Sequence, residues 1–369
     1  MTSPGHAVAS DVTLVSLIIE HASAHDLPAL CRASKSLNAP AERALYKALT
    51  FYEPHTAGQV CRVLAHAPRL AQLVRAFSIV ARYSRVRLPA GDLPNTWWQN
   101  VAHALRGMSA LESLVLANLA GPTPYGWVLP AAPVFQLREA RILFPWTADA
   151  DAFVMHQRAL RFLHVVDIAP GLDVPGVQEQ AALADAPDVL LPALEIIDVP
   201  VRIATQFLGS PLTHIQVIPD AESLSSSGDV MAFMSHLWRV RETLRSLAVH
   251  DAPEYRSAEI VLQVAQHCPG LQYLGVLALP PASRSTLHTH LMGLPKLVIL
   301  ELEVSRWSPA PSLPMQRALA TELQTYCSSL RIMIFWLHSH RFVFHLNQDT
   351  GVWVGRADPG PGGPSWRYL

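Results

Sequence analysis

The residues of this sequence whose types and spacing could do chemistry are few and occur in short pairs. Asp149 and Asp151 form a D-x-D pair in "TADADAF", a spacing that can bind a divalent cation together with a sugar nucleotide. Two H-x-H pairs occur in "LHTH" (287–290) and "LHSH" (337–340), and neither has a third ligand close by in the sequence. We expect the D-x-D pair to lie in an Ala-rich loop without a phosphate cradle, so the sequence predicts no metal site.

Local catalytic motifs are missing from the sequence. It contains no G-x-S-x-G elbow, no H-E-x-x-H, no G-x-G-x-x-G and no G-x-x-x-x-G-K-[ST]. The four cysteines are far apart and form no C-x-x-C pair, which predicts buried free thiols at Cys31, Cys61, Cys268 and Cys327. The sequence therefore predicts no catalytic residue and no cofactor. An α/β enzyme whose site is assembled from dispersed residues remains an alternative.

Composition and charge limit the classes of partner. Of 369 residues, 50% are hydrophobic and 15% are charged, which allows a large or a long continuous core. The 28 Lys and Arg nearly balance the 29 Asp and Glu, so no overall field attracts nucleic acid or a membrane surface. The longest apolar runs are far shorter than a bilayer-spanning helix, and no basic region precedes the first apolar segment. We expect a soluble intracellular protein, cytoplasmic or nuclear or both.

A six-residue pattern recurs along most of the chain. It has apolar residues at positions one, four and six, as in "LVILEL" from Leu297, and we refer to it as the template. Ten segments fit, starting at Val74, Leu111, Leu137, Leu160, Leu194, Leu212, Leu244, Leu271, Leu297 and Leu330. Successive starts lie 18 (Leu194 to Leu212) to 37 (Val74 to Leu111) residues apart, with most near the 20 to 29 residues typical of leucine-rich repeats or a little above.

The template predicts a short strand whose fourth and sixth residues point inward while the first anchors the turn before it. One such strand buries little alone, whereas stacked neighbours bury a continuous core. Apolar residues at helical spacing predict helices over 95–108, 229–244 and 257–270, with Asn95, Asp229 and Ser257 as caps. The predicted fold is therefore an α/β leucine-rich-repeat solenoid, a curved parallel sheet with outer helices. An ordinary doubly wound α/β fold is the alternative, disfavoured by the shared template and the missing Gly-rich turns.

The two ends of the chain differ from the middle. We expect a disordered N-terminus over 1–10 and a helical segment without repeat strands over 11–70, ahead of the repeats in 71–338. Alternating runs around "NQDTG" predict a hairpin over 339–358 that caps the last repeat. The Pro- and Gly-rich residues 359–369 are predicted to be a loose tail.

Three short motifs follow one another within residues 14–52. An apolar helix is followed by D-L-x-x-L-x-x-x-S-K/R and then by A-x-x-x-L-Y. The matching residues are Ile18, Ile19, Asp26, Leu27, Leu30, Cys31, Ser34, Lys35, Ala41, Leu45 and Tyr46. This order resembles the divergent F-box-like segment of large fungal protein families, and "HAPRLAQLVRAFSIV" (66–80) resembles the junction that opens their repeats.

The resemblance implies a partner and a set of contact residues. In that family the box docks onto a Skp-type adaptor of a cullin-RING ubiquitin ligase, while the repeats hold the protein target and the chain has no catalytic role. The implied adaptor-binding residues are Leu14, Ile18, Leu27, Leu30, Cys31, Leu45 and Tyr46. The family's box commonly opens with Leu-Pro, whereas this sequence has "ASDVTL" there, which weakens the ligase role more than the fold.

A simpler interpretation of residues 14–52 is a helical cap that shields the apolar end of the first repeat. The chain would then be a leucine-rich-repeat interaction scaffold with no link to a ubiquitin ligase. Both interpretations predict that Leu14, Ile18 and Leu45 are buried.

The target surface is expected on the concave face of the strands, at template positions three and five. Mixed polar and aromatic side chains there suit a protein or peptide partner, and the predicted target-binding residues are Phe162, His164, Asp198, His214, Gln216, Tyr273 and Glu301. Some of these side chains would be covered if the C-terminal tail or local packing lies over them. A one-residue slip in register would exchange the two faces.

Overall fold

The computed structural model describes residues 12–23, 25–80, 93–117, 125–169, 190–218, 228–282 and 284–358. The predictions for residues 1–10 and 359–369 lie outside these ranges. The chain divides into two compact units, Met1–Leu160 and Arg161–Leu369, which we describe separately. Among the described residues, no helix has both the length and the apolar character needed to span a bilayer.

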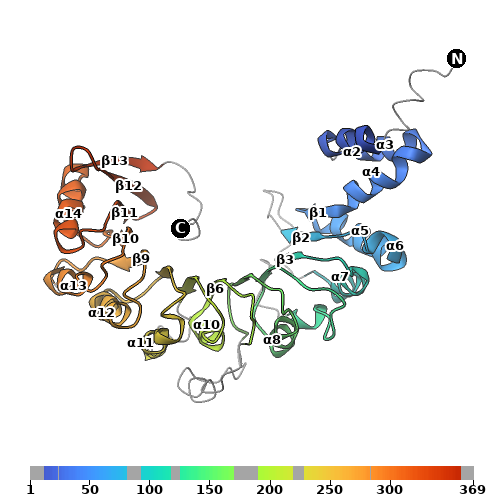
Figure 1. Ribbon diagram of the computed structural model, residues 1–369. Coiled ribbons are helices and arrows are strands. Elements are labelled where there is room, and N and C mark those ends of the chain that lie inside the picture. Colours follow the sequence, from blue (N-terminus) through green and yellow to red (C-terminus); the bar gives the residue numbers. More distant parts are fainter. Residues whose placement is uncertain are drawn as a thin grey trace. The chain divides into compact units, whose positions relative to one another are not determined.

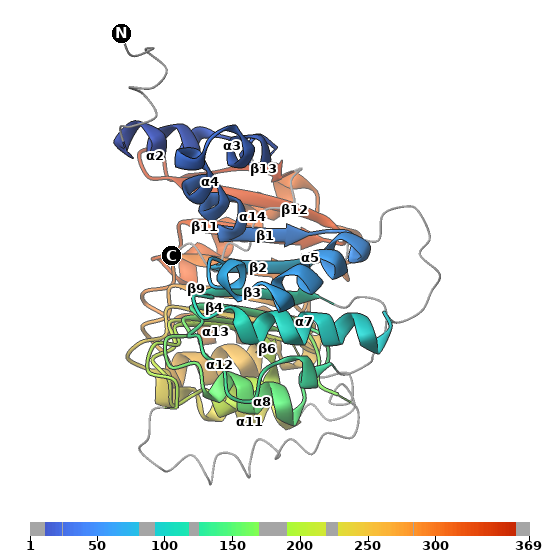
Figure 2. The ribbon, with the colours of Figure 1, turned by 90° about the vertical axis from the view of Figure 1, so that its right-hand side faces the viewer.

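The first unit joins a helical segment to four strands. Its helices are α2 (Val12–His21), α3 (Leu27–Ala33), α4 (Lys35–Lys47), α5 (Pro54–His66), α6 (Pro68–Ala71), α7 (Asn95–Gly107) and α8 (Ala148–Met155), with a 3-10 turn η1 (Gly126–Val128). Its strands are β1 (Ala48–Phe51), β2 (Ala76–Val80), β3 (Ser113–Ala117) and β4 (Glu139–Leu143), which pair in parallel in this order. Helices α5 and α7 lie together on one face of β1 to β3 (Figure 2).

The second unit continues the alternation of strands and helices. Its strands are β5 (Phe162–Val165), β6 (Ile196–Pro200), β7 (His214–Ile218), β8 (Ser246–Val249), β9 (Tyr273–Ala278), β10 (Ile299–Glu303), β11 (Ile332–Leu337), β12 (His340–Asn347) and β13 (Val352–Asp358). Its helices are α10 (Val201–Gln206), α11 (Gly228–Ser235), α12 (Ser257–His267), α13 (Arg284–Leu291) and α14 (Leu313–Tyr326), with 3-10 turns η3 (Leu237–Val240) and η4 (Glu254–Arg256). Helices α10 to α14 lie along one side of these strands (Figure 1).

Strand pairing in the second unit is parallel from β5 to β11 and antiparallel from β11 through β13. The last two strands form the hairpin expected around "NQDTG". Gly351 takes a φ of 66° in its turn, a conformation that glycine adopts without a steric penalty. The mixed α/β class with a mostly parallel sheet is thus confirmed, and the leucine-rich-repeat solenoid stays a prediction.

Every one of the ten template segments contains a strand that starts at template position three. These first residues are Ala76, Ser113, Glu139, Phe162, Ile196, His214, Ser246, Tyr273, Ile299 and Ile332. Within each unit they align across neighbouring strands, for example Ala76 with Ser113. Positions one and four are buried in all ten segments. Since full burial of one such apolar side chain contributes about 1.5 to 3 kcal/mol, the template supplies much of the core.

Position six departs from the template at one strand. Val276 is half-buried because the pairing of β9 with β10 contains an irregularity that brings Leu277, one residue later, opposite Leu302. An extra residue of this kind in one strand is the mark of a β-bulge. Leu277 therefore takes the buried place that the template assigned to Val276.

The residues leading into most of the strands share one hydrogen-bond geometry, which we call the lead-in turn. In seven of the ten segments the template's first residue donates its N–H to the carbonyl three residues earlier, as Leu111 does to Met108 at 3.1 Å. Leu212 and Leu244 bond instead to Ser210 and Val240, and Leu137 donates to the Gln157 side chain. The carbonyl of position two then accepts two N–H groups from the next segment. At Arg75 these come from Glu112 at 2.8 Å and Ser113 at 3.0 Å. The double acceptance recurs at Glu112, Arg161, Glu195, Thr213, Arg245, Gln272 and Val298.

Several sequence expectations are wrong in detail. Strand β1 lies inside the segment expected to contain no repeat strand, because "YKALTF" (46–51) also fits the template and pairs in parallel with β2. The helix expected over 229–244 ends at Ser235 and is followed by the 3-10 turn η3. Asp149 and Asp151 lie in the first turn of α8 and not in a loop, because the Thr147 side chain accepts the Ala150 N–H at 3.2 Å and caps that helix.

Candidate protein-binding surfaces

The N-terminal helical segment, residues 12–47, has a small core of its own. Val15 and Ile19 of α2, Leu27 of α3 and Ala41 of α4 are buried against one another. Half-buried side chains pack around them, namely Ala22, Leu30, Cys31, Leu37, Ala44 and Leu45. Because every member of this cluster lies within residues 12–47, the fold of α2 and α3 depends on contacts inside the segment.

Helix α4 connects this segment to the strands of the first unit. It ends at Lys47 and β1 begins at the next residue. The Arg69 guanidinium of the short helix α6 makes two hydrogen bonds to the Glu42 carboxylate of α4, one of them at 2.9 Å from Nη2 to Oε1. That bonding lowers the pKa of Glu42. The segment is therefore attached to the strands through α4.

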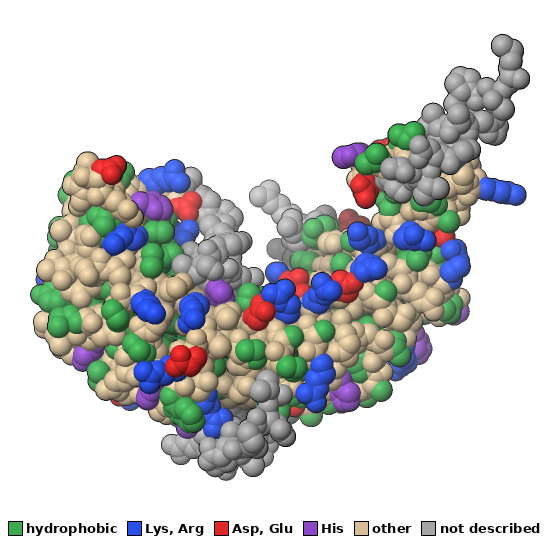
Figure 3. All heavy atoms as spheres, viewed as in Figure 1, with side chains coloured by type: hydrophobic (Ala, Val, Ile, Leu, Met, Phe, Trp, Pro, Cys, Tyr) green, Lys and Arg blue, Asp and Glu red, His purple; other side chains and the backbone are tan. Residues whose placement is uncertain are grey.

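Helix α2 carries an exposed apolar ridge, which we define as Leu14, Leu17 and Ile18. Their exposed fractions are 43%, 46% and 44%. Residues three and four apart lie on one helix face, so these three side chains form a continuous strip. Hydrophobic side chains are visible at the surface of this helical segment in Figure 3.

The burial expected for Leu14 and Ile18 is therefore wrong, and Leu45 is only half-buried. The physical reason is that the core side of α2 is formed by Val15 and Ile19, while the ridge faces away from that core. Leu17 lies in the same exposed ridge, although the sequence analysis did not single it out. Its spacing from Leu14 was the available signal.

The other predicted adaptor-binding residues lie closer to the small core. Leu27 is buried, with an exposed fraction of 6%, and cannot form a direct contact while the segment is folded. Leu30, Cys31 and Tyr46 are half-buried. Burial also raises the pKa of the Cys31 thiol. The accessible part of the predicted set thus consists mainly of Leu14 and Ile18.

Template positions three and five define the second candidate surface, which we call the helix-free face. Positions four and six are buried on the helix side, so positions three and five point the other way. Pairing in the second unit aligns His164 with Asp198 and Asp198 with Gln216. His214 lies in the neighbouring row, opposite Ile196 and Ser246. The predicted target-binding residues of β5 to β7 therefore share one face.

Polar contacts within this row bury part of it. Gln216 Nε2 donates to Asp198 Oδ1 at 2.7 Å, and His164 Nε2 lies 3.7 Å from Asp198 Oδ2. Asp198 is 4% exposed and Phe162 9%, so the expectation of exposure is wrong for both. Asp198 lies between His164 and Gln216 of the neighbouring strands, and the Phe162 ring lies beside that of His164. His164, His214 and Gln216 are half-buried. Burial lowers the pKa of the His214 imidazole.

The expectation of exposure is also wrong for Tyr273 and Glu301, at 1% and 3%. The Glu301 carboxylate accepts hydrogen bonds from the Tyr273 hydroxyl and the Trp336 indole N–H, and Arg341 Nε of the hairpin lies 3.9 Å from it. Gly275 makes room for this arrangement, since a Cβ there would lie 2.7 Å from both the Tyr273 hydroxyl oxygen and the Glu301 Cβ. Side chains from β11 and β12, distant in sequence, cover these two residues.

An apolar cluster continues the helix-free face across β8 to β12. Its buried members are Ala248, Tyr273, Ile299 and Ile334, with Ile196, Val298, Ile332, Trp336 and Val343 packed against them. Each buried member occupies template position three or five. In this part of the second unit both faces of the sheet are therefore buried, as is common in parallel sheets.

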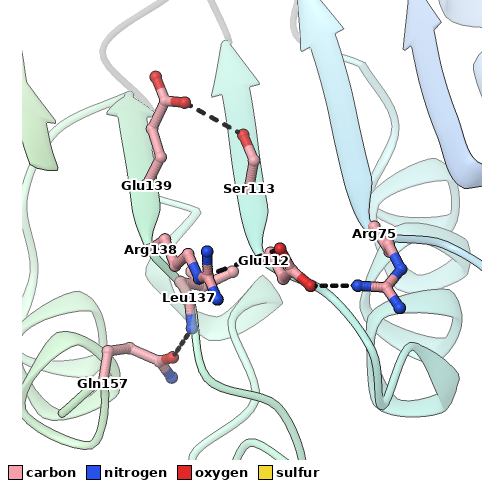
Figure 4. Close-up of polar contacts among 7 residues, drawn as sticks. All are labelled: Arg75, Glu112, Ser113, Leu137, Arg138, Glu139 and Gln157. Atoms are coloured by element: carbon pink, nitrogen blue, oxygen red, sulfur yellow. Dashed lines mark hydrogen bonds and ion pairs between the residues drawn. The ribbon is translucent and has the colours of Figure 1, made fainter. Parts of the chain in front are cut away.

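The helix-free face of the first unit is more polar (Figure 4). Glu139 interacts with the Ser113 hydroxyl at 3.4 Å and with Arg141 Nε at 2.8 Å. At template position two, Glu112 accepts a bond from Arg75 at 2.5 Å and lies 4.0 Å from Arg138. The sequence analysis did not single out these position-two charges, although their regular spacing was visible in the template.

Cysteines and acidic side chains give no sign of a metal site in the described ranges. Cys61, Cys268 and Cys327 are buried free thiols, as predicted, while Cys31 is only half-buried. Burial raises the pKa of Cys61 and that of Cys268 to about 12. No group of three or more His, Cys, Asp or Glu residues among those described could hold a metal ion.

No protein-family model and no curated protein matches this sequence.

Proposed function

We propose that this protein is a non-enzymatic recognition adaptor of the leucine-rich-repeat type, like the F-box substrate receptors of cullin-RING ubiquitin ligases. The ridge on α2 recruits a Skp-type adaptor, and the helix-free face of the repeats holds a protein target. The solenoid architecture is part of this proposal. It is supported by the recurring lead-in turn and by strands that start at one template position.

The observation that carries the proposal is the exposure of Leu14, Leu17 and Ile18 on a helix that has its own core. A helix whose role was to shield the first repeat would place its apolar residues against that repeat. Three adjacent apolar side chains at 43–46% exposure are typical of a surface that a partner covers. An amphipathic helix of this kind can dock in a groove of another protein.

The capping role is supported for α4. This helix leads directly into β1, packs against it and is bonded to α6 through Glu42 and Arg69. Capping and recruitment are then divided between helices, with α4 closing the first strand and α2 presenting the ridge. A leucine-rich-repeat scaffold without a ligase partner would use only the first of these two roles.

For the target, the accessible residues of the predicted set are His164, His214 and Gln216. Phe162, Asp198, Tyr273 and Glu301 are buried and would support the surface from beneath. Polar side chains such as Glu139 and Arg141 provide a comparable surface in the first unit. We propose that a polar protein segment binds these accessible positions.

A pull-down with a purified Skp-type adaptor tests the recruitment role. The triple variant Leu14→Asp/Leu17→Asp/Ile18→Asp should lose at least about tenfold in adaptor binding, because three anchors of the contact become charged. Leu313→Asp/Met315→Asp is the matched control, since these α14 residues are equally apolar and 46% and 42% exposed. That control should bind like the parent chain.

Circular dichroism of each variant checks that α2 remains folded. Binding by the parent that survives the triple substitution would exclude the ridge as the contact. If the parent chain itself does not bind the adaptor, the ligase role is excluded and the scaffold function takes its place.

A further inference from the structure

A pocket of about 790 Å³ lies beside the carboxyl ends of β8, β9 and β10. Its lining includes Asp251, Glu254 and Tyr255 from the loop after β8, Pro280 after β9, and Glu303 and Arg306 at and after the end of β10. The volume falls within the range of pockets that bind small molecules. Loops at the carboxyl ends of parallel strands are a recurrent location for binding sites.

The loops around this pocket are held in place by specific contacts. Arg306 Nη1 lies 3.4 Å from Glu254 Oε2 and joins the loop after β10 to the loop after β8. The Trp307 indole N–H donates to the Leu279 carbonyl at 2.7 Å and joins the loop after β10 to the end of β9. The pocket is therefore framed by three loops that are bonded to one another, which favours a preformed site.

The lining has an excess of negative charge. It contains three carboxylates and one guanidinium, and that guanidinium is paired with Glu254. In the described part of the chain, no basic side chain lies within ion-pair distance of Asp251 or Glu303. Tyr255 adds an aromatic ring that is 71% exposed, with the Arg256 guanidinium 5.5 Å from the ring centroid. A cation in this pocket would meet two unneutralised carboxylates and the edge or remaining face of one aromatic ring.

The composition of the lining indicates which kind of cation would fit. A bare metal ion is disfavoured, because no group of three His, Cys, Asp or Glu residues in the described ranges could hold one. An Arg or Lys side chain has an apolar stem as well as a charged end. Pro280 and Tyr255 can contact such a stem while Asp251 and Glu303 bind the charge.

We propose that this pocket binds an Arg or Lys side chain of the protein target. The inference rests on the proposed recognition function and deepens it by assigning a basic segment of the target to one place on the second unit. Recruitment through α2 plays no part in it. The pocket can therefore be tested on the purified chain without the adaptor.

The test is a fluorescence-anisotropy titration with a fluorescein-labelled, N-acetylated Gly-Arg-Gly-Arg-Gly peptide at low salt. Asp251→Asn/Glu303→Gln should weaken binding about tenfold, because two ion pairs are lost while the side-chain shapes are kept. Tyr255→Leu should weaken it by about threefold through loss of the aromatic contact. The peptide Gly-Glu-Gly-Glu-Gly should not bind.

Glu20→Gln/Asp349→Asn is the matched control, because it removes the same amount of charge at exposed residues that are not part of the pocket lining. It should leave binding within twofold of the parent. An equal loss in this control, or equal binding of the acidic peptide, would overturn the proposal. So would a parent chain that does not bind the arginine peptide. A failed adaptor pull-down, in contrast, would remove the ligase role and leave these outcomes unchanged.

Discussion

The two ends of the chain are built in different ways. The N-terminal helical segment (12–47) has a separate small core, and its ion pair to α6 joins Glu42 to an Arg69 side chain that is 72% exposed. The C-terminal hairpin (340–358) continues the sheet, and Arg341, which is 10% exposed, lies between Glu301 of β10 and Asp358 of β13. Trp353 is also buried and donates to Gln324 of α14 at 3.0 Å.

This difference indicates which end can unfold locally while the rest of the chain stays folded. The hairpin shares side-chain contacts with β10, β11 and α14, so its opening would expose core residues of those elements. The small core of the helical segment consists only of residues within the segment, so unfolding of the segment would expose little of the strands. Local stability in proteins follows such differences in shared burial.

The largest effect is expected from placing a charge in either core. Leu300→Asp should destabilise the second unit by at least ~4 kcal/mol, because Leu300 is fully buried at template position four and the carboxylate would have no partner. Val15→Asp should instead melt only residues 12–47. Hydrogen exchange measured by mass spectrometry, peptide by peptide, distinguishes local from global loss of protection.

Ile18→Asp is the control for the second substitution. This side chain is 44% exposed, so its replacement should change stability by no more than about 0.5 kcal/mol. Unchanged thermal unfolding of Leu300→Asp would show that the assigned register of β10 is wrong. If Val15→Asp unfolded the whole chain, the N-terminal segment would depend on the strands as the hairpin does, and the difference between the two ends would be wrong.

A smaller effect is expected from removing one arginine at each end. Arg341→Met removes a buried guanidinium that lies 3.9 Å from Glu301 and is paired with Asp358, which should cost ~3 kcal/mol. Arg69→Met breaks a pair whose guanidinium is mostly in solvent, and should lower the free energy of unfolding far less than Arg341→Met does. Urea denaturation of both variants measures the two values. Equal costs would remove the distinction drawn between the ends.

The smallest effect concerns the reaction of thiols with a disulfide reagent. At pH 8 the half-buried Cys31 should react first, and a Cys31→Ser variant should lose that fast phase. Cys61 and Cys268, whose pKa burial raises to about 12, should react only through opening of their units. Rapid reaction of Cys268 in the folded chain would contradict the burial described for the second unit.

These raised pKa values also predict how the stability of the fold changes with pH. A thiol that ionises at about 9 when unfolded and at about 12 when folded contributes stability that is fully present below the unfolded pKa. That contribution is lost as the pH rises from about 9 towards 12. Cys61→Ala removes this contribution, so the stability of the variant should fall less between pH 9 and pH 12 than that of the parent chain. Alkaline unfolding followed by circular dichroism, with each protein compared with its own stability at pH 7, measures this difference.

The strands could be predicted from the sequence because their pattern is local. Three apolar residues at fixed spacing mark both the start of each strand and its buried side, and Ser113, Tyr273 and Ile332 all begin strands at the expected position. Strand β1 escaped notice because "YKALTF" directly follows a helix, so its first apolar residue, Tyr46, belongs to α4. Because Tyr46 also fits the apolar spacing of that helix, it was assigned to the helix and not to template position one.

Burial on the helix-free face could not be predicted in the same way. Whether Tyr273 and Glu301 are exposed depends on Trp336 and Arg341, which come from strands further along the chain. Alternation reports which side a residue points to, and it does not report what covers that side. The ridge on α2 was misjudged for a related reason, because apolar periodicity cannot tell a face packed against a core from an apolar face at the surface.

The lead-in turn restricts where this chain can change in length. In eight of the ten segments, template positions two and three are fixed by two bonds to one carbonyl of the preceding segment, as Glu112 and Ser113 are at Arg75. One added residue between Arg245 and Leu247 would break those bonds and turn the rest of β8 over. Added residues after the last residue of a strand would leave the same bonds in place. Tolerance to insertions should therefore alternate along the chain with the strands, a pattern that an epitope-tag scan would display directly.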